Sequence, residues 1–257
     1  MRHIIAWSGG KDSTCTVIKM HELLEEGILD IPRSDIEVVI AEVMYCNKRG
    51  ISAESRIHLE FVEKARRVFE EEFGFRTVVL ISDRDFLSCF NHVMEKAVKH
   101  PENIGKRYGF PLNGMCVIQR DCKIRPMERY LEQVRGDYVQ YLGICADETY
   151  RLKAMHKKPY TRSLLEEYGI IEKMTVDICK KYDLYSPTYE YSSRNGCFFC
   201  CNSKLYENAQ FKQEQPGVWE EFVNLEKEEN LAHSRWNVFK ETLAERDRRV
   251  DEILLNA

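Results

Sequence analysis

Short apolar runs alternate with helical patterns through the first part of the chain. Four apolar runs predict buried strands, at residues 4–7, 37–44, 77–81 and 138–144. Between them, apolar residues recur at the spacing of a helix face and predict helices at residues 13–26, 52–73 and 86–98. Strands that alternate with helices predict an α/β fold with a parallel sheet covered on both faces.

The pattern changes after residue 100. Residues 101–111 are rich in Gly, Pro and polar side chains and predict a loop. Beyond residue 151 the chain shows short helical segments, aromatic turns and a group of cysteines, and from residue 218 it is charged and helical. We therefore expect an α/β domain over residues 1–155 and a cysteine-containing helical region over residues 156–257 that packs on it.

Composition narrows the class of protein. The 257 residues are 44% hydrophobic, which predicts a packed core, and the formal net charge of −4 argues against general duplex binding. A local basic groove, and with it a nucleic-acid partner, stays open. No apolar run approaches the roughly 18 residues of a membrane span, and the start lacks the features of a signal peptide. We expect a cytoplasmic protein without a membrane partner.

Ten cysteines are then informative, because structural disulfides are rare in a reducing compartment. Metal binding or redox chemistry is the better expectation for some of them. Five stand singly in apolar patterns, where free cysteines act as small buried side chains. These five are Cys15, Cys46, Cys89, Cys145 and Cys179.

A glycine-rich turn joins the first predicted strand to the first predicted helix. Its residues are Ser8, Gly9, Gly10, Lys11, Asp12 and Ser13. Ligands of an open parallel sheet bind beyond the carboxyl ends of the strands, and glycine lets backbone N–H groups approach an anion. The helix N-terminus adds partial positive charge and Lys11 a full charge. The turn predicts a phosphate site, and a tight strand–helix turn without a ligand is the alternative.

The turn matches neither the Walker loop nor the dinucleotide-binding glycine pattern. It resembles the PP-loop of the N-type ATP pyrophosphatases, whose adenine nucleotide alpha-hydrolase-like fold is a Rossmann-type sandwich. Three further stretches resemble the phosphoadenosine phosphosulfate (PAPS) reductase-like branch. They are RDCKIRP at residues 120–126, GICADETYR at residues 143–151, and RNGCFFC at residues 194–200. The second has one residue fewer before its arginine than the pattern of that family.

The resemblance implies that the turn holds the phosphates of ATP or of a PAPS-type nucleotide. The reaction would occur at or near the α-phosphate, where Lys11 and the N–H groups of the turn would stabilise charge on the phosphate oxygens. Asp12 would cap the helix or orient a Mg²⁺ ion.

The same resemblance implies a second group of contacts around the nucleotide. Arg151 would be a second phosphate clamp, because its planar fork suits bidentate contacts. Glu42 would begin a segment beside the adenine, and Gly143 would begin the second nucleotide-binding segment. Asp147 and Glu148 would associate with the metal or would be solvated loop acids.

Two cysteine pairs are candidate metal ligands: Cys116 with Cys122, and Cys197 with Cys200. Four thiolates can hold a 4Fe–4S cluster or a tetrahedral Zn²⁺ ion. The wide spacing of the first pair favours the cluster, and members of the resembled family include cluster binders. Zn²⁺, a redox-active dithiol and four unrelated buried cysteines are the alternatives. Cys201 could replace a ligand or react.

Three functions follow from these features. The leading hypothesis is an enzyme that binds ATP and adenylates an unidentified acceptor with release of pyrophosphate, with a thiol or sulfur donor protein as a further partner. The second is a PAPS or adenylyl-sulfate reductase with an external thiol donor. Those reductases carry a nucleophilic cysteine in a C-terminal tail, whereas no cysteine follows Cys201 here. The third is a non-catalytic regulatory module with structural zinc.

The aromatic C-terminal helices could also form a homodimer.

Overall fold

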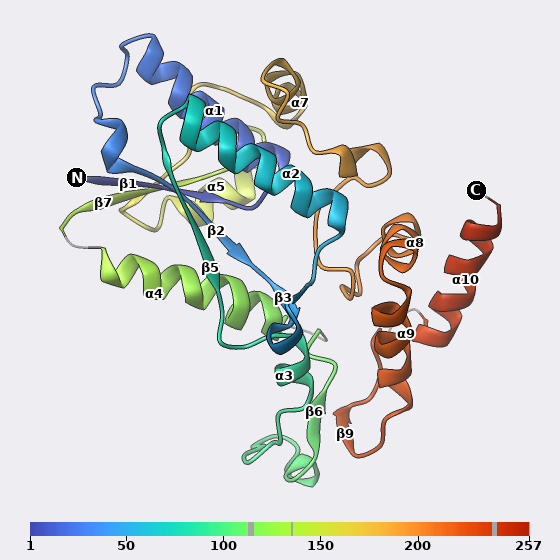
Figure 1. The fold of residues 1–257 in the computed structure, drawn as a ribbon. Coiled ribbons are helices and arrows are strands. Elements are labelled where there is room, and N and C mark those ends of the chain that lie inside the picture. Colours follow the sequence, from blue (N-terminus) through green and yellow to red (C-terminus); the bar gives the residue numbers. More distant parts are fainter. Residues whose placement is uncertain (113–115, 135, 238–240, 257) are drawn as a thin grey trace. The chain divides into compact units, whose positions relative to one another are not determined.

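The computed structural model describes residues 1–112, 116–134, 136–237 and 241–256 (Figure 1). They form two compact units. The first unit comprises Met1–Ala41, Ile57–Leu80 and Met127–Glu190, and the second comprises Glu42–Arg56, Ile81–Pro126 and Tyr191–Ala257. This division differs from the expected boundary at residue 155, because two segments of the first half leave the sheet and join the C-terminal residues.

The first unit is built on a parallel sheet. β1 pairs in parallel with β2 on one side and with β7 on the other, and β7 pairs in parallel with β8. The α/β class and the parallel sheet are therefore confirmed. β8 is too short for a periodic signal, so the sequence did not predict it. The strand order is β5 (Arg76–Ile81), β2 (Ile36–Glu42), β1 (Arg2–Trp7), β7 (Tyr138–Leu142) and β8 (Thr161–Arg162).

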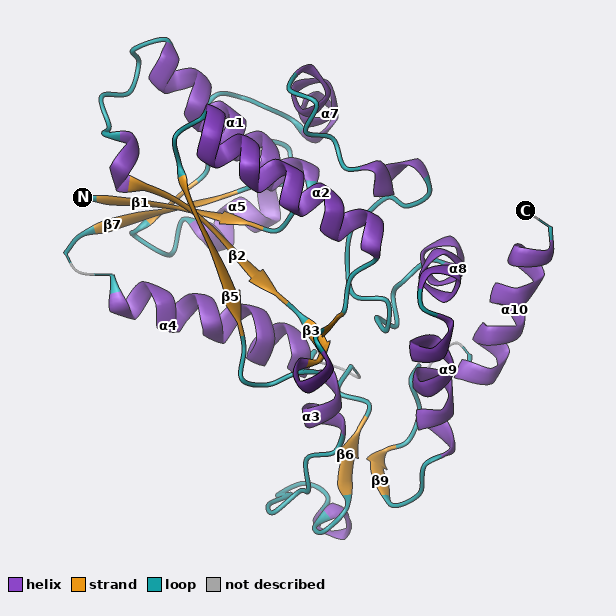
Figure 2. Cartoon of the chain, viewed as in Figure 1, coloured by secondary structure: helices purple, strands orange, loops and turns teal. Residues whose placement is uncertain are grey.

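Helices alternate with these strands along the chain (Figure 2). α1 and α2 contribute to the same core on one face of the sheet, and α4 lies on the opposite side (Figure 1). In β2, Ile36, Val38 and Ile40 belong to the core on the side of α1, whereas Glu37 accepts a hydrogen bond of 2.5 Å from Tyr130 of α4. The helices are α1 (Lys11–Glu25), α2 (Arg56–Arg67), α4 (Arg125–Gln133), α5 (Thr149–Met155), α6 (Leu164–Glu167) and α7 (Glu172–Lys181).

The second unit has small sheets and an aromatic core. β3 pairs with β4 antiparallel, and β6 pairs with β9 in parallel. Phe198 stacks on Phe211 with ring centroids 3.7 Å apart, and Trp219, Phe222 and Trp236 are buried in the same core. Its elements are β3 (Met44–Cys46), β4 (Ile51–Ser52), α3 (Phe86–Phe90), β6 (Arg107–Gly109), α8 (Leu205–Glu214), α9 (Pro216–Asn224), β9 (Leu231–His233) and α10 (Leu243–Leu255).

Several predicted elements differ from the structure. The helix predicted at residues 52–73 comprises α2 and the π-helical segment Val68–Glu72, and Ser52 belongs to β4. The strand predicted at residues 37–44 ends at Glu42, and β3 follows as a separate strand. The helix predicted at residues 86–98 is only α3, which Asp85 caps by accepting a bond of 2.6 Å from the Ser88 N–H. The loop predicted at residues 101–111 contains β6, because β9, far along the chain, supplies its pairing partner.

Burial agrees with the expectation for the single cysteines. All five, Cys15, Cys46, Cys89, Cys145 and Cys179, are buried. Burial raises the pKa of Cys179 to about 12 and raises the pKa of Cys15 and Cys145 further. Among the described residues, no helix has the length and apolarity that crossing a membrane requires.

Candidate functional site

The glycine-rich turn lies where the strand order of the first sheet reverses. From β1 the sheet extends through β2 on one side and through β7 on the other. Ligands of open α/β sheets bind in the crevice beyond the strand ends at such a switch point. Ser8 directly follows β1, and Gly143 directly follows β7. Two of the segments that carry the family resemblance therefore meet at the expected ligand-binding corner.

Two glycines allow close packing at this corner. A Cβ atom on Gly143 would lie 2.6 Å from the Ser13 backbone N atom and 2.7 Å from the Ser13 Cα atom. Gly9 has φ +72°, and a Cβ atom there would lie 2.7 Å from His58 Nε2. Only glycine fits these positions without movement of the neighbouring backbone or of the buried His58 ring.

Hydroxyl groups hold the shape of the turn. The Ser8 and Ser13 Oγ atoms are 3.0 Å apart, and Ser13 Oγ donates to the Gly10 carbonyl oxygen at 3.0 Å. The Ser8 N–H also donates to Ser13 Oγ, at 3.1 Å. Both predicted serines therefore bond within the turn, which fixes the start of α1.

The first N–H group of α1 has a phenol as its partner. Gly10 is the N-cap residue and makes no side-chain cap bond, and the Lys11 N–H donates to the Tyr189 hydroxyl at 3.0 Å. An anion at a helix N-terminus binds such N–H groups. Tyr189 comes from the one-turn segment Pro187–Glu190, and no motif identified it beforehand.

Asp12 does not supply the helix cap that was expected of it. Its Oδ1 atom accepts a bond of 3.0 Å from the Thr175 hydroxyl of α7 and lies 3.0 Å from the Lys11 Nζ atom. The carboxylate thereby links the first turn of α1 to α7 and lies beside the ammonium group of the turn.

The Lys11 ammonium group is shared between two carboxylates. Its Nζ atom lies 2.7 Å from Glu172 Oε1 as well as 3.0 Å from Asp12 Oδ1. Burial would lower the pKa of Lys11, but the bonds to Glu172 and Asp12 outweigh it and raise that pKa above its ordinary value. Lys11 is therefore firmly cationic, and a phosphate would have to compete with these acids.

The second family-like segment is tied to the same corner. Asp147 Oδ1 accepts a bond of 3.1 Å from the Glu172 N–H, at the first residue of α7. Glu148 accepts a bond of 3.0 Å from the Cys145 N–H and lies 2.6 Å from Arg151 Nη1. Asp147 is thus linked to Lys11 through Glu172.

Two of the predicted nucleotide contacts, Arg151 and Glu42, are not linked to the turn by the bonds described above. The structure pairs Arg151 with Glu148, and the arginine side chain is 56% exposed. Glu42 ends β2 and belongs to the second unit. The phosphate clamp by Arg151 and the adenine contact near Glu42 therefore stay predictions.

The predicted metal ligands all lie in the second unit. Cys122 lies in the π-helical segment Gln119–Ile124, and Cys116 shortly precedes it. Cys197 and Cys200 lie before α8, where the Cys200 N–H donates to the Cys197 carbonyl oxygen at 3.0 Å and closes a tight turn. Burial raises the pKa of Cys197 to about 12, and negative charge on Cys200 and Cys116 contributes to that shift.

Cys200 has a lowered pKa and therefore thiolate character. A hydrogen bond from Cys201 lowers the pKa of Cys200 to about 5, and Arg194 Nη2, 3.3 Å from the Cys200 sulfur, acts in the same direction. The Cys122 thiol instead donates to the Arg84 carbonyl oxygen at 3.3 Å, and its interaction with Cys89 raises the pKa of Cys122.

The part of the chain that the structure describes shows no formed metal site. Within the described ranges, no three Cys, His, Asp or Glu side chains stand in an arrangement that could hold a metal ion. The four predicted thiols share one unit, and Cys116, Cys122 and Cys197 belong to its core, but joint ligation of a metal by the four stays a prediction.

No protein-family model matches the chain. An uncharacterized protein of Methanocaldococcus jannaschii, MJ0066, is 24% identical to it over 242 residues. The aligned region covers 90% of this chain and 42% of the archaeal protein, so the chain spans less than half the length of that relative.

Proposed function

We propose that the chain is a PP-loop enzyme of the PAPS reductase-like type that binds ATP by its phosphates at Ser8–Ser13. It adenylates an acceptor and releases pyrophosphate. The observation that supports this function is the coincidence of the glycine turn, the start of α1 and the buried part of Lys11 at the switch point of a parallel sheet. A PAPS-type nucleotide presents the same phosphate chemistry and is the second candidate ligand.

In this function, the α-phosphorus forms a bond to a nucleophilic atom of the acceptor. The bond from the α-phosphorus to its bridging oxygen breaks, and pyrophosphate leaves with the electron pair. Lys11 and the N–H groups of the turn stabilise the negative charge that builds on the phosphate oxygens. Binding requires that a phosphate oxygen take the place of the Tyr189 hydroxyl at the Lys11 N–H and draw the ammonium group from Glu172.

Two inorganic groups belong to the proposal. A Mg²⁺ ion bound to the triphosphate would find carboxylate ligands in Asp12 and Glu172 at the turn, and it would neutralise phosphate charge. Cys116, Cys122, Cys197 and Cys200 would hold a 4Fe–4S cluster or, alternatively, Zn²⁺; their thiol chemistry suits either. Iron with acid-labile sulfide in anaerobically purified protein supports the cluster, and stoichiometric zinc supports the alternative.

Substitution of Lys11 tests the nucleotide site. Charge-assisted hydrogen bonds contribute about 1.5–3 kcal/mol, so Lys11→Ala should weaken ATP binding by at least about 10-fold in isothermal titration calorimetry. Lys19→Ala is the matched control, because Lys19 lies on the same helix and bonds Glu22 at 3.4 Å. We expect it to change ATP affinity by less than about twofold.

A folded Lys11→Ala protein that keeps full ATP affinity would contradict the proposal. The reaction is then assigned by its products. Exchange of labelled pyrophosphate into ATP in the presence of an acceptor supports adenylation, and sulfite release from PAPS with a thiol donor supports a reductase. Nucleotide binding without turnover supports the regulatory module.

A further inference from the structure

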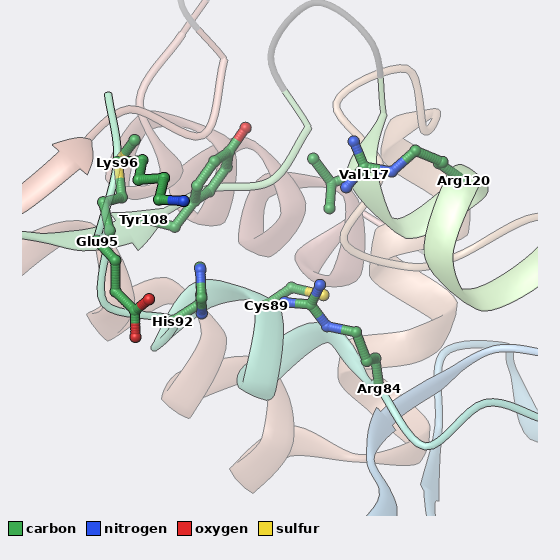
Figure 3. Close-up of a pocket in the computed structure, with 9 residues that line it drawn as sticks. Arg84, Cys89, His92, Glu95, Lys96, Tyr108, Val117 and Arg120 are labelled. Carbon is green, nitrogen blue, oxygen red and sulfur yellow. The ribbon is translucent and has the colours of Figure 1, made fainter. Parts of the chain in front are cut away.

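A pocket of about 410 Å³ lies in the second unit (Figure 3). No motif in the sequence pointed to it, and it lies outside the proposed nucleotide site. Its volume is in the range of small-molecule sites. Positively charged side chains are prominent in its lining, which comprises Arg84, Cys89, His92, Met94, Glu95, Lys96, Tyr108, Val117 and Arg120.

A buried carboxylate orders the arginines of this pocket. The Asp121 side chain is only 1% exposed, and it accepts bonds from Arg120 Nε at 2.6 Å and from Arg84 Nη1 at 2.8 Å. Arg125 Nη1 lies 2.9 Å from the same carboxylate. Three guanidinium groups around one carboxylate leave a surplus of two positive charges. The surplus is held in place, because each arginine is bonded to a buried group.

The two arginines that line the pocket can still bind a ligand. A guanidinium group has five N–H donors, and the bonds of Arg84 and Arg120 to Asp121 use only some of them. The planar fork of arginine matches the oxygens of a phosphate or carboxylate. The Arg84 and Arg120 side chains are 35% and 42% exposed, so solvent and ligands reach them.

The facing side of the pocket adds a third cation and an aromatic surface. Lys96, Tyr108, His92 and Glu95 lie on one side of the pocket, across from Arg84 and Arg120 (Figure 3). The Tyr108 ring contacts the His233 ring, with centroids 4.7 Å apart, which holds the tyrosine in place. Val117 and Met94 provide apolar contacts.

We propose that this pocket binds a small organic molecule that carries a phosphate group. A phosphate monoester has a charge of about −1.5 to −2 at neutral pH, and the three cations of the lining, Arg84, Arg120 and Lys96, can pair with it. Its oxygens can be bonded by both arginines and by Lys96, while the organic part contacts Tyr108 and Val117. A pocket of this volume suits a small ligand better than a nucleic acid, whose binding requires an extended basic surface.

Binding of phenyl phosphate tests the proposal. The titration uses the full chain carrying Lys11→Ala, so that the turn in the first unit does not contribute. We expect saturable binding with one site per chain, and affinity at least about 10-fold lower in the added variant Arg120→Gln, because a charge-assisted bidentate contact is lost. Phenol, which lacks the phosphate, should not bind measurably.

Two further variants separate ligand contact from folding. Arg125→Gln removes a cation from the same carboxylate but not from the pocket lining, so it should lower the affinity by less than about threefold. Lys96 is exposed, so Lys96→Gln leaves the core intact and should lower the affinity by about three- to fivefold.

The proposal would be overturned if the folded Arg120→Gln and Lys96→Gln proteins bound phenyl phosphate as tightly as the Lys11→Ala parent does. Tighter binding of a single-stranded oligonucleotide than of phenyl phosphate would also overturn it, because the pocket would then be part of a nucleic-acid surface. Neither result bears on the nucleotide proposal, which depends on Lys11 in the first unit.

Discussion

The turn at Ser8–Ser13 and the arginine pocket around Asp121 have opposite charge arrangements. In the first unit, one ammonium group, that of Lys11, lies between the carboxylates of Asp12 and Glu172. In the second unit, one carboxylate, that of Asp121, is shared by three guanidinium groups. The first region has a surplus of negative side-chain charge and the second a surplus of positive charge.

The difference shows that the two regions would bind anions in different ways. At the turn, the attraction comes from backbone N–H groups at the start of α1, and the side chains around Lys11 oppose an incoming anion unless a cation accompanies it. At the pocket, side chains provide the attraction directly. A nucleotide site that depends on Mg²⁺ and a phosphate site that does not are the expected consequences.

Removal of the shared carboxylate should have the largest effect on stability. Taking one partner from a buried ion pair costs about 3–5 kcal/mol, and we expect Asp121→Ala to lower the free energy of unfolding by about 3 kcal/mol, because its arginines remain partly exposed. Urea denaturation measures the change. Asp251→Ala is the control: Asp251 pairs with Lys212 at 2.6 Å but is 50% exposed, and its loss should cost less than about 1 kcal/mol. Equal losses in both variants would show that Asp121 does not organise the arginines.

Crowding at the turn should have the next largest effect. A methyl group at Gly143 meets the Ser13 backbone at 2.6 Å, so Gly143→Ala should lower the free energy of unfolding by about 2 kcal/mol and should also weaken ATP binding. Gly217→Ala is the matched control in α9, where a Cβ atom meets nothing within 4 Å. Wild-type stability and affinity in Gly143→Ala would mean that close packing of β7 on α1 does not build the turn.

The smallest expected effect tests the charge around Lys11. Glu172→Gln keeps the side-chain shape and removes one of the two carboxylates that compete with a phosphate. Because Glu172 is 61% exposed, its pair with Lys11 contributes at most about 1 kcal/mol, and we expect ATP without Mg²⁺ to bind about threefold more tightly. Glu167→Gln, which removes a pair with Arg162, should leave the titration unchanged. Weaker ATP binding in Glu172→Gln would instead show that Glu172 positions Lys11 for the phosphate.

Local patterns predicted much of the first unit. The run at residues 4–7 and the helical spacing after residue 13 correspond to β1 and α1, because period and capping are properties of neighbouring residues. The same reasoning identified Ser8 and Lys11 as residues of one turn, and the family resemblance added Gly143. Both missed Tyr189 and Glu172, whose neighbours in sequence carry no signal and which reach Lys11 only in the folded chain.

The second unit was harder to predict from sequence. Its core joins residues 42–56 and 81–126 to the C-terminal segment, and β6 exists because β9 pairs with it. Cys116, Cys122, Cys197 and Cys200 were identified by their spacing, whereas the bond from the Cys122 thiol to the Arg84 carbonyl oxygen depends on tertiary packing.

The sequence by itself determined the strand–turn–helix corner, the α/β class and the candidate thiols, because short-range periodicity, glycine geometry and residue chemistry are local properties. Tertiary structure alone decided which charges face one another. It placed two carboxylates on Lys11 and three arginines on Asp121, since electrostatic energy depends on distances in space between residues that the chain order separates.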